Sequence, residues 1–307
     1  MEKVDLRKAG LDRLIAGPVL FAEPADRHTS MGVGGPIDAL AFPESREELA
    51  RLVAFLGQQR IPFLPVGNWT NLIVRGGGYR GVLISLSGLR RLTRSDNPDG
   101  TVLLEAEAGV ALSELVNLSQ REALTGIEFC AGIPGSVGGA VRMNAGAYGG
   151  EIKDVCNSIQ SLTTDKGIRT LKRKDLPFAY RILDLPAEMI IIGAAFCLQR
   201  GKGEVVAATV RDFLSRRKDK HPLEFRNAGS IFKNPREIPA GQLIEQTGLK
   251  GMRLGDAQVS EKHGNFIVNR GQATAEEILT LLDLVQKRVF EATGQFLEPE
   301  VKIIGVP

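Results

Sequence analysis

The most distinctive stretch of this 307-residue chain reads Gly126-Ile-Glu-Phe-Cys-Ala-Gly-Ile-Pro-Gly-Ser-Val-Gly-Gly-Ala-Val-Arg-Met-Asn-Ala-Gly-Ala-Tyr-Gly-Gly150. It is not a linker, because Ile133, Val137 and Val141 are interleaved with the glycines and can pack into a core. Glycine leaves the backbone amides open to close approach by a phosphate group or a flat ring. A tightly packed structural turn would have the same composition, so the stretch by itself fits both interpretations.

Strand and helix patterns alternate before this stretch. Asp38–Phe42 is strand-like, and the following Ser45-Arg-Glu-Glu48 is a capping box that predicts a helix through about Gln58. Apolar and β-branched runs predict further strands, and apolar residues at helical spacing predict a second helix. These predicted elements are the strands Ile61–Val66, Leu72–Val74, Val82–Leu86 and Thr101–Ala108 and the helix Ala111–Glu122.

The character of the chain changes near residue 200. Residues 200–237 hold ten Lys and Arg against five Asp and Glu, which suits either a diphosphate ligand or a solvated helix face. The capping box Thr274-Ala-Glu-Glu277 then predicts a long amphipathic helix that ends near Gly294. Gln295–Gly305 follows as a predicted strand. We therefore place a domain boundary near residue 200.

Composition excludes several classes of protein. The 39 Lys and Arg against 36 Asp and Glu give a net charge of +3, too small to indicate general nucleic-acid binding. The longest strongly apolar run, Met189–Leu198, is far shorter than the roughly 20 residues of a membrane helix. Met1–Lys8 lacks the apolar core of a signal peptide. With the odd, widely spaced set of Cys130, Cys156 and Cys197, we expect a reduced cytoplasmic protein.

Metal and nucleotide motifs are also informative. No C-x-x-C occurs and the three histidines are scattered, so we expect no metal site. Gly76–Gly81 matches G-x-G-x-x-G, but Val82–Leu86 after it is strand-like rather than helical, which predicts a turn between strands and no Rossmann domain. Neither G-x-x-x-x-G-K-[ST] nor G-x-S-x-G is present.

Five segments, taken together and in this order, resemble the flavoenzyme family of UDP-N-acetylenolpyruvoylglucosamine reductases (UDP-N-acetylmuramate dehydrogenase, MurB), which serves bacterial peptidoglycan synthesis. The resemblance covers nearly the whole chain and is to the compact members of the family. The segments are His28-Thr-Ser-Met-Gly-Val-Gly-Gly35, Gly132–Gly149, Asn227-Ala-Gly-Ser-Ile-Phe-Lys-Asn-Pro235, Gly255-Asp-Ala-Gln-Val-Ser-Glu-Lys-His263 and Leu297-Glu-Pro-Glu-Val301.

The resemblance implies an α+β fold with two domains. Residues 1–200 would form an FAD-binding domain of the vanillyl-alcohol-oxidase (PCMH) type, with two α+β subdomains at about 1–65 and 66–200. Residues 201–307 would form an α/β substrate-binding domain, whose C-terminal strand returns to the active site. We also expect a monomer that binds neither nucleic acid nor membrane.

The resemblance further implies FAD as cofactor and NADPH as cosubstrate. The segments Val66–Asn71 and Gly132–Gly139 would line the FAD, which favours cofactor binding over a merely structural turn. Trp69 departs from the family, where glycines are frequent, so we expect either an altered FAD affinity or an outward-turned ring. The implied cofactor residues are Val66, Gly67, Asn68, Trp69, Thr70, Asn71, Gly132, Ile133, Pro134, Gly135, Ser136, Gly138, Gly139, Asn144 and Gly146.

The implied chemistry is hydride transfer from NADPH to FAD and then to the enolpyruvyl double bond. By resemblance, Ser230 would protonate C2, Arg181 would bind the substrate carboxylate, and Glu300 would stabilise the enolate. Glu298 competes with Glu300 for this role, although the position of Pro299 favours Glu300. The implied substrate-binding residues are Tyr180, Lys233, Asn234 and Lys250, whereas His263 is interpreted as structural.

Two other functions stay open on the sequence. One is a different flavin oxidoreductase of the same fold, against which Ser230, Lys233 and Glu300 argue in their shared contexts. The other is a non-catalytic UDP-sugar-binding protein, against which the intact set of Arg181, Ser230 and Glu300 argues.

Overall fold

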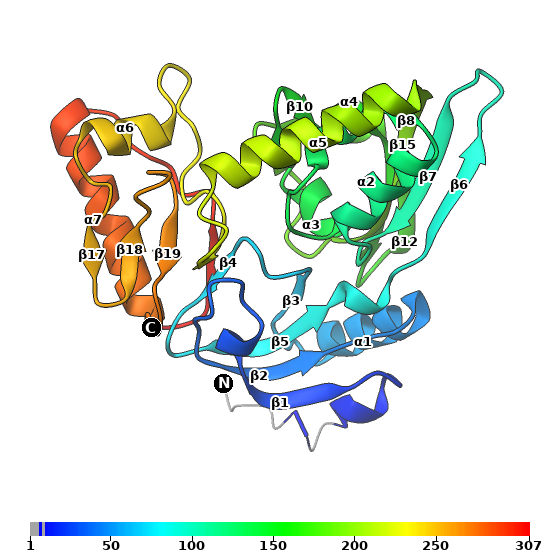
Figure 1. Ribbon diagram of the computed structural model, residues 1–307. Helices are drawn as coiled ribbons and strands as arrows, with labels where there is room; N and C mark the ends of the chain where they lie inside the picture. Colours follow the sequence, from blue (N-terminus) through cyan, green and yellow to red (C-terminus); the bar gives the residue numbers. More distant parts are fainter. Residues whose placement is uncertain (1–5, 8–9) are drawn as a thin grey trace. The chain divides into compact units, whose positions relative to one another are not determined.

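The computed structural model describes residues 6–7 and 10–307 (Figure 1). The prediction that Met1–Lys8 is no signal peptide therefore lies mostly outside the described residues. Contacts between residues divide the chain into two units, and the chain passes between them several times. Unit 1 comprises Met1–Phe21, Ala39–Asn68 and Gly81–Arg216. Unit 2 comprises Ala22–Asp38, Trp69–Arg80 and Arg217–Pro307.

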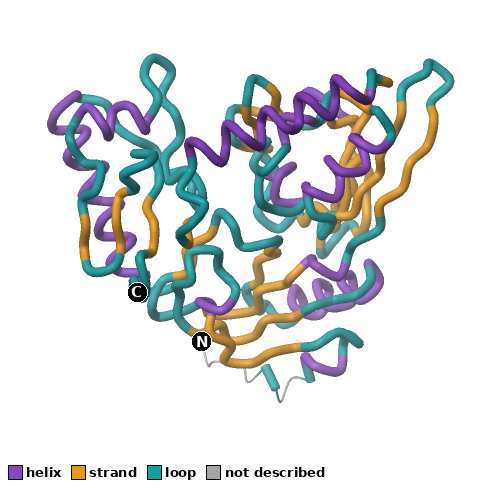
Figure 2. Tube along the Cα trace, in the orientation of Figure 1, coloured by secondary structure: helices purple, strands orange, loops and turns teal. Residues whose placement is uncertain are grey.

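Helices and strands alternate in both units, with many short elements between them (Figure 2). The mixed α+β class is therefore confirmed. In the part of the chain that the structure describes, no helix is long and apolar enough to cross a membrane. The division of the chain at residue 200 into a cofactor domain and a substrate domain stays a prediction.

A large antiparallel sheet forms the centre of unit 1, in the order β12-β11-β15-β7-β6, with β8 also pairing with β15. Helices α2 (Leu112–Arg121) and α3 (Val137–Arg142) belong to the same core, and Leu112, Leu115 and Val116 are buried in it as their helical spacing predicts. The strands are β6 (Leu92–Asp96), β7 (Val102–Glu107), β8 (Leu124–Thr125), β11 (Cys156–Thr163), β12 (Gly167–Lys172) and β15 (Ile190–Arg200).

A second sheet has the strand order β1-β2-β5-β3. Its strands are β1 (Val19–Pro24), β2 (Pro36–Ala41), β3 (Phe63–Val66) and β5 (Tyr79–Ser85). Helix α1 (Arg46–Gln58) connects β2 to β3, and its apolar residues Leu49, Leu52 and Leu56 are fully buried. The strands and the helix predicted over this region are therefore confirmed.

The capping box predicted at Ser45 is only half formed. The Ser45 hydroxyl accepts a hydrogen bond from the Glu48 backbone N–H at 3.1 Å, as predicted. The Glu48 carboxylate, however, accepts from the N–H groups of Glu44 (2.9 Å) and Ala16 (3.1 Å) instead of returning to Ser45. These backbone bonds, chiefly that from Glu44, lower the pKa of Glu48 despite the opposing effect of burial.

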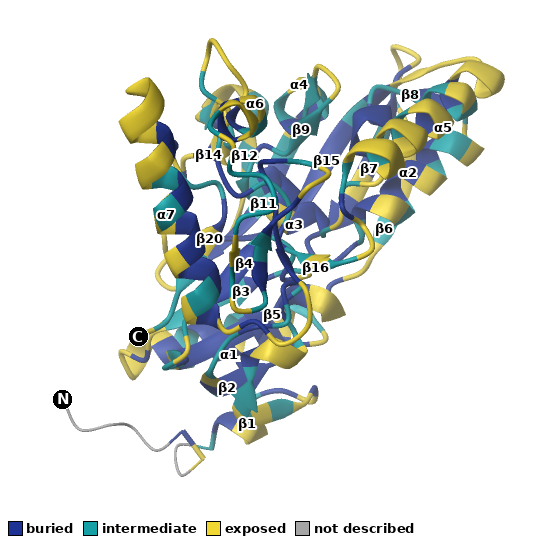
Figure 3. Ribbon diagram, turned by 60° about the vertical axis from the view of Figure 1, so that its left-hand side comes forward, coloured by how far each residue is buried: buried dark blue, intermediate teal, exposed yellow. Residues whose placement is uncertain are grey.

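Unit 2 contains an antiparallel sheet in the order β16-β19-β18-β17 and the long helix α7 (Ala275–Thr293). The capping box of Thr274 and Glu277 is complete, and Gly294 ends the helix with φ 70°, both as predicted. Figure 3 shows one side of α7 buried and the other exposed. The strands are β16 (Arg226–Asn227), β17 (Arg253–Leu254), β18 (Ala257–Val259) and β19 (Ile267–Asn269).

The predicted C-terminal strand over Gln295–Gly305 is wrong in its extent. Only β20 (Lys302–Ile304) is a strand, and it pairs in parallel with β4 (Leu72–Val74). Pro299 has no N–H and cannot continue a ladder on its donor side. The residues around Pro299 pair instead with a different segment, described below.

The first half of the G-x-G-x-x-G motif, Gly76–Gly78, lies between strands β4 and β5, and the second half, Tyr79–Gly81, belongs to β5. The motif continues as a strand and not as a helix, so the prediction that it forms no Rossmann turn is confirmed. Gly78 has φ +84°, which favours glycine. A methyl group on Gly77 would lie 2.1 Å from the carbonyl oxygen of Pro307. These glycines therefore allow close packing of backbone on backbone.

The remaining elements are short, apart from one helix. They are the 3-10 helices η1 (Leu11–Arg13), η2 (Ala25–Arg27), η3 (Leu86–Gly88), η4 (Glu128–Cys130) and η5 (Arg173–Asp175), the helices α4 (Ile152–Val155), α5 (Gly203–Lys220) and α6 (Ala240–Gln246), and the strands β9 (Gly146–Ala147), β10 (Gly150–Glu151), β13 (Phe178–Ala179) and β14 (Ile182–Leu183).

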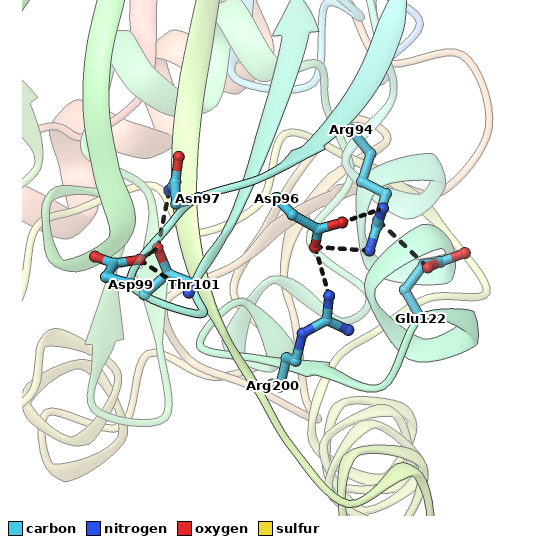
Figure 4. A network of polar contacts seen from close by, with 7 residues as sticks. All are labelled: Arg94, Asp96, Asn97, Asp99, Thr101, Glu122 and Arg200. Carbon is cyan, nitrogen blue, oxygen red and sulfur yellow. Dashed lines mark hydrogen bonds and ion pairs between the residues drawn. The ribbon is translucent and has the colours of Figure 1, made fainter.

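Charged side chains form a network at the end of the β6–β7 hairpin (Figure 4). Arg94 makes two bonds of 2.9 Å to Asp96, which also contacts Arg200. In the adjoining turn, Asp99 accepts hydrogen bonds from the hydroxyl and the N–H of Thr101, which lower the pKa of Asp99. These groups are largely exposed, so each ion pair contributes at most about 1 kcal/mol to stability.

Candidate active site

Two of the predicted cofactor segments meet inside unit 1. A methyl group on Gly67 would lie 2.3 Å from Ser136 Oγ, so glycine at position 67 lets the two segments approach this closely. The backbone fixes the second segment, because the Leu112 N–H donates to Gly135 O (3.0 Å) and the Gly138 N–H donates to Ala108 O (2.9 Å). Backbone hydrogen bonds therefore fix Gly132–Gly139, which together with Gly67 we call the cradle.

Ser136 is buried at this meeting point, with 2% of its surface exposed. Its hydroxyl has no hydrogen-bond partner among the residues that the structure describes. Leaving such a group unsatisfied costs about 1–3 kcal/mol, so a ligand that supplies a partner is expected here. Exposed Gly139 and the positive φ of Gly135 (144°) add open backbone beside it. The chemistry of this cradle fits a phosphate or a flat cofactor ring.

Trp69 is buried in unit 2, with only 8% of its surface exposed. Its ring packs against His28 with ring centroids 5.4 Å apart, and its carbonyl accepts a hydrogen bond from the Ser30 N–H at 3.2 Å. The expectation of an outward-turned ring is therefore wrong. Trp69 has φ +57°, a conformation that costs a non-glycine residue roughly 1–2 kcal/mol.

Arg181 occupies the two-residue turn between β13 and β14, together with Tyr180. Its φ of +60° is unusual for arginine, and such strain is often found at functional sites. Arg181 Nη1 donates to the carbonyl oxygen of Gly146 at 2.8 Å, and its guanidinium lies 5.4 Å from the centre of the exposed Tyr180 ring. The structure thus joins three predicted site residues, Arg181, Tyr180 and Gly146.

Asn144 forms a hydrogen bond to the residue just before this turn. It is fully buried, and its Nδ2 donates to Ala179 O (2.9 Å) and to Glu151 Oε2 (3.0 Å). Its Oδ1 accepts from the Lys153 N–H at 2.9 Å. The side chain is therefore engaged with protein groups, and its assignment to the cofactor set stays a prediction.

Arg142 is a second anchor, which sequence reasoning missed. Its Nη2 donates to the carbonyl oxygen of Leu185 at 2.8 Å, just beyond β14. Arg142 lies in the glycine-rich stretch, but the sequence of that stretch does not indicate that this side chain reaches Leu185. Only the position of Leu185 in space assigns it a role.

Ser230 and Glu300 lie on two segments that run side by side in unit 2. The Glu300 N–H donates to Ile231 O (2.7 Å) and the Lys233 N–H donates to Glu298 O (2.8 Å). Phe232 and Pro299 form an antiparallel bridge between them. The predicted proton donor and the predicted enolate stabiliser are therefore brought together from distant parts of the sequence.

The two carboxylates that compete for the same role, Glu298 and Glu300, have different surroundings. Lys233 Nζ lies 2.5 Å from Glu298 Oε1, and the Glu298 side chain is 64% exposed. Glu300 is only partly buried, and Asn71 Nδ2 donates to its carbonyl oxygen at 3.0 Å. Glu298 is thus engaged by a lysine at the surface, and the assignment of the catalytic role to Glu300 stays a prediction. Within the described residues, the Ser230 hydroxyl makes no hydrogen bond.

The other predicted substrate residues have local protein partners. Asn234 Oδ1 accepts from the Ala240 N–H at 3.1 Å, at the start of α6. Lys250 Nζ pairs with Glu245 Oε1 at 3.0 Å. His263 packs against Phe266 with ring centroids 4.9 Å apart, and burial lowers its pKa, which supports its structural interpretation.

Cys130, Cys156 and Cys197 are free thiols, and burial raises the pKa of Cys156 to about 11. The described portion of the chain holds no group of three or more His, Cys, Asp or Glu placed to bind a metal ion.

Comparison with known proteins identifies the family. Residues 37–171 match the model of an FAD-binding domain, and residues 221–304 match that of the UDP-N-acetylenolpyruvoylglucosamine reductase C-terminal domain. The reductase of Syntrophus aciditrophicus (strain SB) is 55% identical over 298 residues, covering 97% of this chain and 96% of that protein. The chain belongs to the UDP-N-acetylenolpyruvoylglucosamine reductase family.

Further UDP-N-acetylenolpyruvoylglucosamine reductases agree. That of Caldanaerobacter subterraneus subsp. tengcongensis is 46% identical over 290 residues, with 94% of each chain covered. The crystal structure of the reductase (MurB) from Thermus caldophilus matches with a TM-score of 0.78 at 33% identity, covering 94% of this chain and 99% of that one. The chain is accordingly an FAD-dependent oxidoreductase, and the predicted vanillyl-alcohol-oxidase type of fold is confirmed.

Ser136→Ala tests the cofactor cradle. We expect the Kd for FAD to rise about 10-fold or more, because a hydrogen bond to a charged group contributes about 1.5–3 kcal/mol. The FAD-free protein should unfold at an unchanged or higher temperature, because the variant removes a buried hydroxyl without a hydrogen-bond partner in the part of the chain that the structure describes. Fluorescence titration and thermal unfolding of the FAD-free protein measure the two effects.

Ser119→Ala is the matched control for this variant. Ser119 is also buried in unit 1, but its hydroxyl donates to Val116 O at 2.8 Å. Its replacement should lower stability slightly and leave the Kd for FAD unchanged. Equal FAD affinity of Ser136→Ala and the unsubstituted protein would remove Ser136 from the cofactor set.

Proposed function

We propose that this protein reduces UDP-N-acetylenolpyruvoylglucosamine to UDP-N-acetylmuramate with NADPH, and that Ser230, Glu300 and Arg181 carry the reaction. The observation that supports it best is the antiparallel pairing of Ile231–Lys233 with Glu298–Glu300, which places Ser230 and Glu300 on neighbouring segments. Family membership supplies the substrate and cosubstrate. The reaction belongs to peptidoglycan synthesis.

FAD would be held by the segments Val66–Asn71 and Gly132–Gly139. The unpartnered hydroxyl of Ser136 and the glycine backbone around it would bind phosphate oxygens or the ring edge. When bound, FAD accepts hydride from NADPH and supplies it to C3 of the enolpyruvyl group. We assign residues 1–200 to the cofactor domain and 201–307 to the substrate domain; the two family matches, one on each side of residue 200, support this assignment.

The protein must stabilise the negative charge that hydride addition at C3 creates. A new C–H bond at C3 leaves an electron pair on C2, delocalised into the carboxylate. Ser230 donates the proton of its hydroxyl to C2, which completes the saturated product and leaves a serine alkoxide that solvent reprotonates. A protonated Glu300 carboxyl donates a hydrogen bond to the enolate oxygen and stabilises it before the proton arrives.

Arg181 would bind the substrate carboxylate through its planar guanidinium. The hairpin that carries it is bonded by Asn144 at Ala179 in β13 and by Arg142 at Leu185 just beyond β14, so little ordering is needed when substrate binds. Lys233 and Lys250 would exchange Glu298 and Glu245 for the diphosphate oxygens, while Tyr180 and Asn234 would contact the rest of the UDP-sugar. We further propose a cytoplasmic monomer that acts without nucleic acid or membrane.

An anaerobic stopped-flow experiment tests the function. The purified protein with FAD is mixed with NADPH and then with UDP-N-acetylenolpyruvoylglucosamine, while the flavin absorbance is followed. We expect bleaching by NADPH and rapid recovery with this substrate. Recovery that is no faster than with UDP-N-acetylglucosamine would point to another flavin oxidoreductase, and no flavin signal would point to a UDP-sugar-binding protein.

A further inference from the structure

We infer that Asn265 is a positioning residue for the reaction, because it fixes the main chain immediately after Ser230. The Asn265 side chain bonds both backbone groups of Phe232. The Phe232 N–H donates to Asn265 Oδ1 at 2.9 Å, and Asn265 Nδ2 donates to Phe232 O at 2.8 Å. The Ile231 N–H donates to the backbone carbonyl of Asn265 at 2.9 Å. This inference rests on the proposed role of Ser230.

The segment after Ser230 is held from two sides. Asn265 takes the N–H of Ile231 and both backbone groups of Phe232 on one side. On the other side, Ile231 O accepts from the Glu300 N–H and the Lys233 N–H donates to Glu298 O. Asn265 therefore bonds this segment much as a neighbouring strand would, with its backbone carbonyl at Ile231 and its side chain at Phe232.

Burial makes these contacts strong. Asn265 is 3% exposed and Phe232 is 1% exposed, so water cannot replace a lost bond. Asn265 is itself held, because its N–H donates to His263 Nδ1 at 3.1 Å. The amide group suits this position, since only a side chain with one acceptor and one donor can satisfy both backbone groups of a single residue.

The expected consequence concerns the proton transfer to C2. A hydroxyl must stay within hydrogen-bond reach of the carbon's developing charge, and a displacement of about 1 Å can lower a rate by about 10²-fold. Asn265 would act through the main chain of Phe232 rather than by contact with substrate or cofactor. It keeps Ser230 and the neighbouring Glu300 segment in register.

The experiment compares Asn265→Ala and Asn265→Asp with Asn269→Ala, using the protein loaded with FAD. Asn269 is a matched control, because it is 5% exposed, lies in β19 and bonds backbone groups of Met31, Gly271 and Ala273 instead of the Ser230 segment. We expect Asn265→Ala to slow reoxidation by substrate roughly 10- to 100-fold, with NADPH reduction changed less than about 2-fold. Asn269→Ala should change neither rate by more than about 2-fold at a similar loss of thermal stability.

Two readouts separate positioning from general damage. Hydrogen exchange of the Phe232 amide should accelerate in Asn265→Ala and stay slow in Asn269→Ala. Asn265→Asp keeps the acceptor for the Phe232 N–H, and its carboxyl regains a donor for Phe232 O when protonated. Its rate deficit relative to the unsubstituted protein should therefore shrink as the pH is lowered. Asn265→Asp also carries the test if Asn265→Ala does not fold.

A double-mutant cycle with Ser230→Ala decides the outcome. If Asn265 acts through Ser230, Asn265→Ala should slow reoxidation less than about 3-fold in the Ser230→Ala background. Fully multiplicative effects, or equal deficits in Asn265→Ala and Asn269→Ala, would overturn the inference. Normal reoxidation in Ser230→Ala alone would instead overturn the proposed role of Ser230, so the two failures are distinguishable.

Discussion

Replacing Ser230 by alanine should slow reoxidation by UDP-N-acetylenolpyruvoylglucosamine by about 10²- to 10⁴-fold, the usual contribution of a positioned proton donor. Reduction by NADPH should stay within about 2-fold, because that step needs no proton at C2. Anaerobic stopped-flow measurement of the two half-reactions gives both rates. The expectation follows from the place of Ser230, directly before a segment that is bonded on both sides.

Ser260→Ala serves as the control for this variant. Ser260 is 3% exposed in unit 2, and its hydroxyl accepts from the N–H groups of Lys262 and His263. Its loss should lower stability without a selective effect on either half-reaction. If Ser230→Ala slowed both half-reactions equally, Ser230 would not be the proton donor.

Glu300→Gln should slow reoxidation by about 10²-fold or more, again with little effect on reduction by NADPH. Glutamine keeps the size and can donate a hydrogen bond, but its amide is a far weaker acid than a carboxyl and stabilises the enolate less. Comparing the two half-reactions by stopped-flow, with the Kd for substrate measured separately, shows whether the loss lies in the chemical step or in binding.

Glu298→Gln is the decisive comparison, because Glu298 lies only two positions away and competes for the same role. Its side chain is 64% exposed and paired with Lys233, so its replacement should change reoxidation less than about 3-fold. A smaller deficit for Glu300→Gln than for Glu298→Gln would move the role to Glu298. A change in substrate Kd for Glu298→Gln without a change in rate would assign Glu298 to the positioning of Lys233 and not to the chemical step.

Local signals in the sequence were reliable where the physical cause is local. The Thr274 capping box and Gly294 set the two ends of α7, because caps and left-handed glycines act within one helical turn. The periodicity of Leu112, Leu115 and Val116 predicted α2 for the same reason. The Ser45 box formed only in part, because the Glu48 carboxylate accepts from the N–H groups of the adjacent Glu44 and of Ala16, which is distant in sequence.

The candidate site shows where such reasoning ends. The resemblance assigned roles to Ser230, Glu300 and Arg181. It gave no information on the contact between Glu298 and Lys233, and it did not identify Arg142 or Asn265. Those roles depend on pairings between segments that are far apart in the chain, and no periodicity records them. The shortness of β20 has the same origin, because the residues before it pair with Ile231–Lys233.

The sequence by itself determined the family, the FAD-dependent chemistry, the helices α1, α2 and α7 and several strands, because motifs and periodic patterns are properties of neighbouring residues. Tertiary structure alone decided that Trp69 is buried against His28, that the Ser136 hydroxyl has no hydrogen-bond partner among the described residues, and that Lys233 engages Glu298. Each of these depends on which distant groups meet after folding. Burial then gives them their effect, because water can no longer compensate for a missing or added partner.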